Sequence, residues 1–351
     1  MVTKAIKLGS PIKPEDAAEP SRSRWARRQT RIDRLRSLEQ PPGGRAREQT
    51  YDAQLNATRQ LLWQRHQPSA IYVRRDVLTR PRFLTSWCDP ADPADEREPL
   101  IRALMAPNGV AVQTLLICLF EVACRAPRAQ SRRTEIPLDY RTSSADVCWV
   151  DLIGVALQQG RPAADRSVSP HDKRLRSIKN ALRRLEEHKL VEFTSRGPRD
   201  RYERFRLLRE GADYSRSSTP VNYTIPAAHA AVSLPVEFFL NGWAHMLTEA
   251  EIALWLTLRL LAHEYQREHR DNGVYLDGDL RRDRFGFDRA GYEAHQQLAA
   301  FGLIHTVQDP RRRPDGTVDD YTTDGPGGLH RFQVTDAGLQ QVALPTVLKA
   351  L

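Results

Sequence analysis

A basic amphipathic segment followed directly by a hairpin, residues 170–208, constrains the fold of this chain more than any other feature. Within it, apolar side chains recur every three or four positions, at Leu175, Ile178, Leu182 and Leu185. At about 100° per residue this spacing places them on one buried helix face. Ser169 is a favourable N-cap and Pro170 suits the first helical position. The sequence therefore predicts a helix that begins at residue 170 and ends near residues 186–189.

Two short strands are expected after this helix. Residues 190–193 read as a strand, Gly197 and Pro198 as a turn, and residues 202–207 as a return strand. The chain at this point therefore reads as a helix followed by an antiparallel hairpin.

Positive charge is concentrated in this segment and in the N-terminal region. The chain of 351 residues has a formal net charge of +9. Residues 166–209 carry 14 Lys and Arg against 6 Asp and Glu, and residues 1–60 carry 13 against 7. The remainder is net acidic. This distribution favours a polyanionic partner.

Several classes of protein are not supported by the sequence. No apolar run approaches the roughly 18 residues of a membrane span, and the first 40 residues lack the apolar core of a signal peptide. The four cysteines form no pair of Cys-x-x-Cys motifs, and Cys118 and Cys124 read as small buried hydrophobes. We expect a cytoplasmic, nucleoid-associated protein with no membrane partner.

Catalytic motifs are also missing. The chain has no phosphate-binding Gly-x-x-x-x-Gly-Lys-Ser/Thr loop, and His263 and His269 are six residues apart, which does not match the His-Glu-x-x-His zinc motif. The carboxylates show no paired spacing. We therefore expect no enzyme, no metal site and no cofactor.

Composition and turn signals divide the chain into five parts. These are a disordered basic arm (1–48), a helical N-terminal extension (49–97), a first domain (98–212), a linker (213–230) and a second domain (231–345). Two interpretations of the arm remain open. It is a solvated tail, or its residues 21–38 form a basic helix that contacts phosphates and folds on binding.

Further elements follow from the apolar pattern. Thr248 and Glu251 have the spacing of a capping box, which predicts the start of a helix that continues over residues 252–265. The other expected helices cover residues 49–66, 100–105, 110–124, 146–157, 279–284 and 288–301, and the other expected strands cover residues 71–73, 303–307 and 329–334.

The two expected domains share a pattern at one fixed offset. Residues 181, 185, 190 and 191 match residues 294, 298, 303 and 304, each 113 positions later, as Ala with Ala, Leu with Leu, Leu with Leu and Val with Ile. Four matches within the same order of elements indicate a repeated module.

The order of elements resembles the winged-helix superfamily, twice over. Two tandem winged helices with a basic arm resemble plasmid replication initiators, and also some bacterial regulators. The resemblance covers about residues 98–340 and rests on periodicity. It implies an α+β, mainly helical fold with two tandem winged-helix domains. In such initiators one module serves mainly dimer contacts and the other mainly origin repeats.

The resemblance indicates which polar residues face double-stranded DNA. In a helix-turn-helix the second helix enters the major groove, where Arg suits guanine and Asn suits adenine. The expected base-reading residues of the first module are Arg176, Lys179, Asn180 and Arg183. Contacts with phosphates are expected from Lys173, Arg184, Arg196, Arg199, Arg201 and Arg204.

The second module is less basic. Its inner helix face holds Gly291, Ala294, Leu298 and Phe301, and its expected base-reading residues are Arg289, Tyr292 and Gln296. A loop with Arg311, Arg312 and Arg313 is a further phosphate contact, although nearby aspartates favour a flexible loop of mixed charge. A dimerisation or protein-binding role fits this module equally well.

The leading hypothesis is a sequence-specific DNA-binding protein that initiates replication of a plasmid or mobile element, with a homodimer as a further possibility. The alternatives are a transcriptional regulator that binds a promoter operator and a winged-helix module that binds protein.

Overall fold

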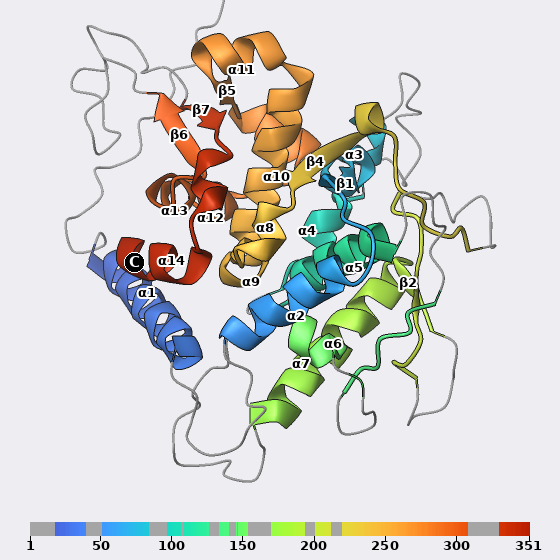
Figure 1. Ribbon diagram of the computed structural model, residues 1–351. Helices are drawn as coiled ribbons and strands as arrows, with labels where there is room; N and C mark the ends of the chain where they lie inside the picture. Colours follow the sequence, from blue (N-terminus) through green and yellow to red (C-terminus); the bar gives the residue numbers. More distant parts are fainter. Residues whose placement is uncertain are drawn as a thin grey trace, which may run out of the picture.

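The computed structural model describes residues 18–39, 51–83, 97–106, 109–125, 133–139, 145, 147–153, 170–193, 201–211, 220–307 and 330–351. Over these residues the fold is mixed α+β, with many helices and three small antiparallel sheets (Figure 1). The expectation of a mainly helical α+β protein is therefore confirmed.

The N-terminal half of the chain contributes the following helices and strands: α1 (Ala18–Glu39), α2 (Tyr51–Trp63), β1 (Ala70–Arg74), α3 (Arg75–Leu78), η2 (Pro81–Phe83), α4 (Leu100–Leu104), α5 (Ala111–Arg125), α6 (Trp149–Leu152), α7 (Pro170–Glu187), β2 (Val191–Glu192) and β3 (Arg206–Leu207).

The C-terminal half contributes η4 (Ala228–Ala230), β4 (Ala231–Pro235), α8 (Glu237–Leu240), α9 (Trp243–Met246), α10 (Glu249–Glu264), α11 (Gln266–Asn272), β5 (Val274–Tyr275), η5 (Leu280–Arg284), α12 (Arg289–Tyr292), α13 (His295–Ala300), β6 (Ile304–Val307), β7 (Arg331–Val334), η6 (Ala337–Gln340) and α14 (Ala343–Ala350).

At the predicted offset of 113 residues, the junction between helix and strand has the same geometry in the two halves. After α7 the chain turns at Lys189 with φ of 57°, and after α13 it turns at Gly302 with φ of 73°. The Leu190 amide donates to the Leu185 carbonyl at 2.8 Å, and the Leu303 amide donates to the Leu298 carbonyl at 3.0 Å. Both junctions are thus helix ends closed by a left-handed residue. At one of them a lysine takes the position that glycine takes at the other.

The two halves share a sheet and a core. Strand β1 pairs antiparallel with β4, with Tyr72 opposite Ser233 at the centre of the register. One continuous cluster of buried apolar side chains includes residues from α2, α5, α7 and α10. The strand predicted over residues 71–73 is therefore confirmed as β1, and through it the extension pairs with β4 of the other half.

The segment predicted as a linker, residues 213–230, is partly packed. Arg74 in β1 forms an ion pair with the buried Glu210, and its guanidinium also donates to the Thr224 carbonyl at 2.5 Å. The same guanidinium lies 5.2 Å from the centre of the Tyr223 ring, which is 1 % exposed. Residues 222–224 therefore belong to the folded body. Polar composition suggested a linker because the sequence does not show the buried partner that Arg74 provides.

The disorder predicted for residues 1–48 is wrong for residues 18–39, which form α1. Figure 1 shows α1 alongside α14, and the two helices are in contact. Leu35 and Leu38 are buried, and Arg31 donates to both carboxylate oxygens of Glu251 at 2.6 and 2.9 Å. The basic helix that was one of the two interpretations is therefore present. The side chain of Arg31 in this helix points inward and pairs with Glu251 of the same chain.

Three further boundaries differ from the prediction. The helix expected over 146–157 ends at Leu152, the helix expected over 288–301 is interrupted between α12 and α13, and the return strand begins at Arg206 after a turn over residues 201–204. Apolar periodicity continues through such interruptions, because short helical turns keep side chains on nearly the same face. The predicted capping box of Thr248 and Glu251 is confirmed.

The carboxylate of Glu249, in the first turn of α10, caps a helix of the other half. One oxygen accepts from the Val112 amide at 2.9 Å and the other accepts from the Ala106 amide at 2.9 Å. Gln113 adds a hydrogen bond to the Leu247 carbonyl at 3.0 Å. The first amides of a helix lack partners within the helix, so Glu249 satisfies them across the interface. Burial raises the pKa of Glu249, and the backbone amides act in the opposite direction.

We predict that Glu249→Gln lowers the free energy of unfolding by about 2 kcal/mol, because a neutral amide replaces a carboxylate that accepts hydrogen bonds from buried amides. Chemical denaturation measures this change. Glu268→Gln is the matched control, since Glu268 pairs with Arg331 at the surface and its removal is expected to leave stability unchanged. Equal stability of Glu249→Gln and the unmodified protein would contradict the role of Glu249.

Candidate nucleic-acid interface

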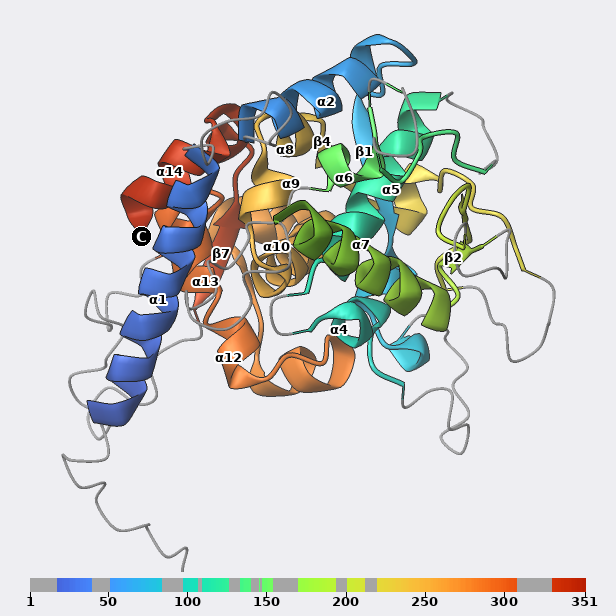
Figure 2. The ribbon, with the colours of Figure 1, turned by 90° about the horizontal axis from the view of Figure 1, so that it is seen from below.

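Helix α7 has one face fixed by packing on α5. Ile178, Leu182 and Leu185 are 0 % exposed and Ala181 is 4 % exposed. Figure 2 shows α7 crossing α5, and the two helices are in direct contact. Because this apolar stripe determines the rotation of α7 about its axis, it also determines which side chains face solvent.

The exposed face of α7 carries three of the residues predicted to read bases. Arg176, Asn180 and Arg183 are exposed, and their spacing of four and three residues aligns them along one stripe. Lys179, the fourth predicted residue, is half-buried beside the stripe. The structure thus brings the predicted base-reading residues of the first module together.

A tyrosine from the turn before β3 stands against this stripe. The Tyr202 hydroxyl accepts from Nη2 of Arg183 at 3.3 Å, and the ammonium of Lys179 lies 5.8 Å from the centre of the Tyr202 ring. The hydrogen bond with Tyr202 raises the pKa of Arg183 above its usual value. The prediction from sequence did not include Tyr202. The only signal was an aromatic residue among the arginines of the hairpin.

The ring of Tyr202 is itself held in place. Phe193, directly after β2, meets it edge to face with ring centres 5.2 Å apart. Arg201 stacks on Phe193, with its guanidinium carbon 5.6 Å from the ring centre, and forms an ion pair with Glu186 of α7. The hairpin is therefore fastened to α7 by aromatic and charged contacts.

The residues predicted to contact phosphates differ in how far their side chains are exposed. Arg184 points inward, where its guanidinium donates to the carbonyls of Ala103 and Met105 at distances of 2.6 to 3.0 Å. This caps the end of α4. Lys173 is half-buried on α7, and Arg204 is exposed in the turn of the hairpin. Arg196 and Arg199 lie outside the described residues.

The second module presents a weaker face of the same kind. Arg289 is exposed and forms an ion pair with Glu293 at 3.5 Å, and Gln296 is exposed. Tyr292 is half-buried under Arg281, whose guanidinium carbon lies 5.3 Å from the ring centre. The inner face predicted for this helix is confirmed, since Gly291, Ala294, Leu298 and Phe301 are buried. Arg311, Arg312 and Arg313 lie outside the described residues.

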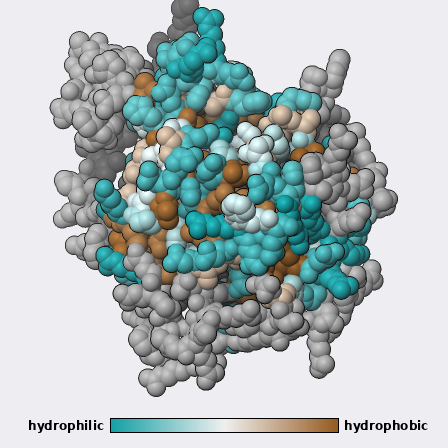
Figure 3. Space-filling view, in the orientation of Figure 1, coloured by the Kyte–Doolittle hydropathy of each residue, from teal (hydrophilic) through white to brown (hydrophobic). Residues whose placement is uncertain are grey.

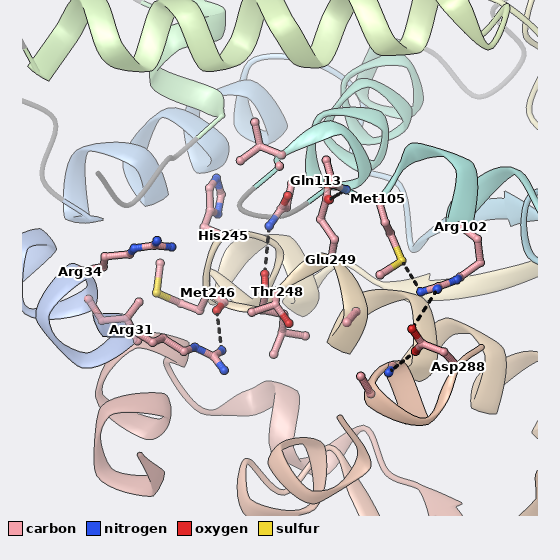
Figure 4. A pocket seen from close by; sticks show the side chains of 18 residues that line it. Arg31, Arg34, Arg102, Met105, Gln113, His245, Met246, Thr248, Glu249 and Asp288 are labelled. Atoms are coloured by element: carbon pink, nitrogen blue, oxygen red, sulfur yellow. Dashed lines mark hydrogen bonds and ion pairs between the residues drawn. The ribbon is translucent and has the colours of Figure 1, made fainter. Parts of the chain in front are cut away.

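A cleft of about 630 Å³ lies between the two halves, bordered by α1, α4, α5, α9, α10 and α12 (Figure 4). Arg102 and Asp288 face each other across one end at 4.0 Å, and Arg34 lies at the other end. The wall of the cleft contains His245, whose Nε2 forms a hydrogen bond with the Leu152 carbonyl at 2.8 Å. Burial lowers the pKa of His245. Charged side chains of both signs line the cleft, so its surface is neither uniformly basic nor uniformly acidic.

Other kinds of site find little support in the part of the chain that the structure describes. There, no group of three or more His, Cys, Asp or Glu side chains is placed to hold a metal ion. None of the described helices has the length and apolar character to cross a membrane. On the face shown in Figure 3, apolar side chains form small areas separated by hydrophilic ones.

No family model, curated protein or solved structure matches this chain.

Proposed function

We propose that this chain is a sequence-specific binding protein for double-stranded DNA, in which α7 enters the major groove. The observation that carries the proposal is the exposed stripe of Arg176, Asn180 and Arg183 on a helix whose opposite face is fully buried. Guanidinium and carboxamide groups are the donors and acceptors that match guanine and adenine edges in that groove. A rigid helix that presents both types side by side is suited to reading bases.

The surrounding elements support two winged-helix modules. In the first, α5 and α7 are followed by the hairpin β2–β3. In the second, α10, α12 and α13 are followed by β6 and β7, and β7 pairs with both β6 and β5. The matching junctions at Lys189 and Gly302 support a shared module. In this arrangement the hairpin flanks the reading helix and contacts the backbone of the duplex.

The two modules have different roles in this proposal. In the first, Arg183 is held by an uncharged tyrosine, whereas in the second Arg289 is paired with Glu293 and Tyr292 is covered by Arg281. We infer that α7 carries most of the base reading. The second module supplies positioning contacts or a protein surface, such as that of a homodimer.

Within DNA binding, the resemblance to plasmid replication initiators favours an initiator that binds origin repeats, with a transcriptional regulator as the alternative. The two differ in their target. Fragments recovered with the protein from its own genome are expected to contain tandem repeats near its gene. A single promoter palindrome would favour the regulator, and recovery of no enriched motif would contradict DNA reading altogether.

We predict that Arg176→Ala and Arg183→Ala each weaken binding to an enriched duplex by roughly tenfold, while binding to a shuffled duplex of equal composition changes much less. Each substitution removes a bidentate contact with a base, which contributes about 1–3 kcal/mol of discrimination. Fluorescence anisotropy titrations with both duplexes measure the ratio. Arg267→Ala, on the exposed surface of α11, is the control expected to change neither affinity. An equal loss for both duplexes would show that α7 contacts only phosphates.

We also predict that affinity falls steeply with salt, with a slope of log K against log [salt] steeper than about −3, because several phosphates are neutralised at once. Lys173→Ala is expected to weaken both duplexes equally and to reduce the magnitude of the slope by about 1. The same titrations at four or more salt concentrations give these slopes. A flat salt response would rule out an electrostatic interface.

A further inference from the structure

The contacts of Tyr202 point to a role for the hairpin in selectivity. Tyr202 lies 19 residues beyond Arg183 in the sequence, yet its hydroxyl contacts Arg183 of the proposed reading stripe and its ring contacts Lys179 beside that stripe. We propose that Tyr202 is a positioning residue for base recognition, which presents Arg183 and Lys179 in a fixed arrangement to the duplex. This inference rests on the proposed function.

The hydrogen bonds of Arg183 fix the plane of its guanidinium. Nη2 donates to the Tyr202 hydroxyl at 3.3 Å and Nη1 donates to Oδ1 of Asn180 at 3.4 Å. A guanidinium has five N–H donors, so three remain for a base. Without these two contacts, an exposed arginine samples many rotamers and loses that freedom on binding. Holding the group beforehand lowers the entropy lost on binding and favours the one register in which its donors meet acceptors.

Lys179 is held by a different part of the same side chain. Its ammonium lies over the Tyr202 ring at 5.8 Å from the centre, which is within the range of a cation–π contact. The ring is in turn supported by Phe193 at 5.2 Å. The hydroxyl and the ring of Tyr202 therefore act on separate cations. Removing the hydroxyl alone changes the contact with Arg183 and leaves the ring, its support and the contact with Lys179 in place.

Tyr202→Phe is the variant that tests this role. We expect it to lower the ratio of affinities for an enriched and a shuffled duplex by roughly three- to tenfold, the range given by the loss of one hydrogen bond. Tyr265→Phe, which removes the hydroxyl of an exposed tyrosine at the end of α10, is the matched control and is expected to keep the ratio. Thermal denaturation of both variants is expected to match that of the unmodified protein.

The double variant establishes whether Tyr202 acts through Arg183. Once Arg183 is alanine, Tyr202→Phe is expected to produce no further change in the ratio, because the two substitutions remove one shared contact. Fully additive losses would overturn the proposal. So would a loss for Tyr202→Phe alone that is equal for both duplexes, since that is the behaviour of a phosphate contact.

A measurement without DNA separates this proposal from the proposed function. ¹⁵N relaxation of the Arg183 side chain is expected to show a more mobile Nε in Tyr202→Phe than in the unmodified protein, and an unchanged order parameter would overturn the positioning role. If the unmodified protein prefers no duplex, the proposed function fails and the selectivity role of Tyr202 fails with it. If it has a preference that Tyr202→Phe leaves intact, only the role of Tyr202 is overturned.

Discussion

The packing of α7 on α5 is the constraint on which the candidate interface depends. Ile178, Leu182 and Leu185 have no exposed surface, so α7 cannot rotate about its axis without exposing them to water. Burial of a leucine or isoleucine side chain contributes about 1.5–3 kcal/mol, and three of them on one stripe hold the helix firmly. The polar stripe opposite is therefore a fixed surface. A protein that discriminates bases requires such a surface, because a base contact depends on direction as well as distance.

A second set of contacts joins the two halves. Glu249 caps α5 from the first turn of α10, and β1 of the first half pairs with β4 of the second. Arg31 adds α1 to the same junction through Glu251 and lies 5.4 Å from the centre of the Phe301 ring. These contacts come from both halves of the chain, and they hold the two halves together around one continuous apolar core.

Features that show in neighbouring residues could be predicted from the sequence, whereas contacts between residues far apart in the chain could not. The start of α7, the side chains on its buried face and the capping box of Thr248 and Glu251 were predicted from residues only a few positions apart, and the repeat was predicted from residue matches at one offset of 113 positions. The inward turn of Arg184 depends on carbonyls about 80 residues earlier in the chain. The docking of α1 depends on Glu251, 220 residues after Arg31. A single sequence contains no pattern that pairs such positions.

The candidate site shows the same division. Arg176, Asn180 and Arg183 were predictable because a helical wheel separates them from the leucines. The contact of Tyr202 was not, because it depends on the path of the turn before β3.

Guanine N7 methylation interference on an enriched duplex is the most direct test of whether α7 lies in the major groove, since N7 is exposed only there. The account predicts that methylation of specific guanines blocks binding by the unmodified protein and that Arg176→Ala removes the effect at one of them. Binding that tolerates methylation at every guanine would contradict a helix that reads guanines in the major groove.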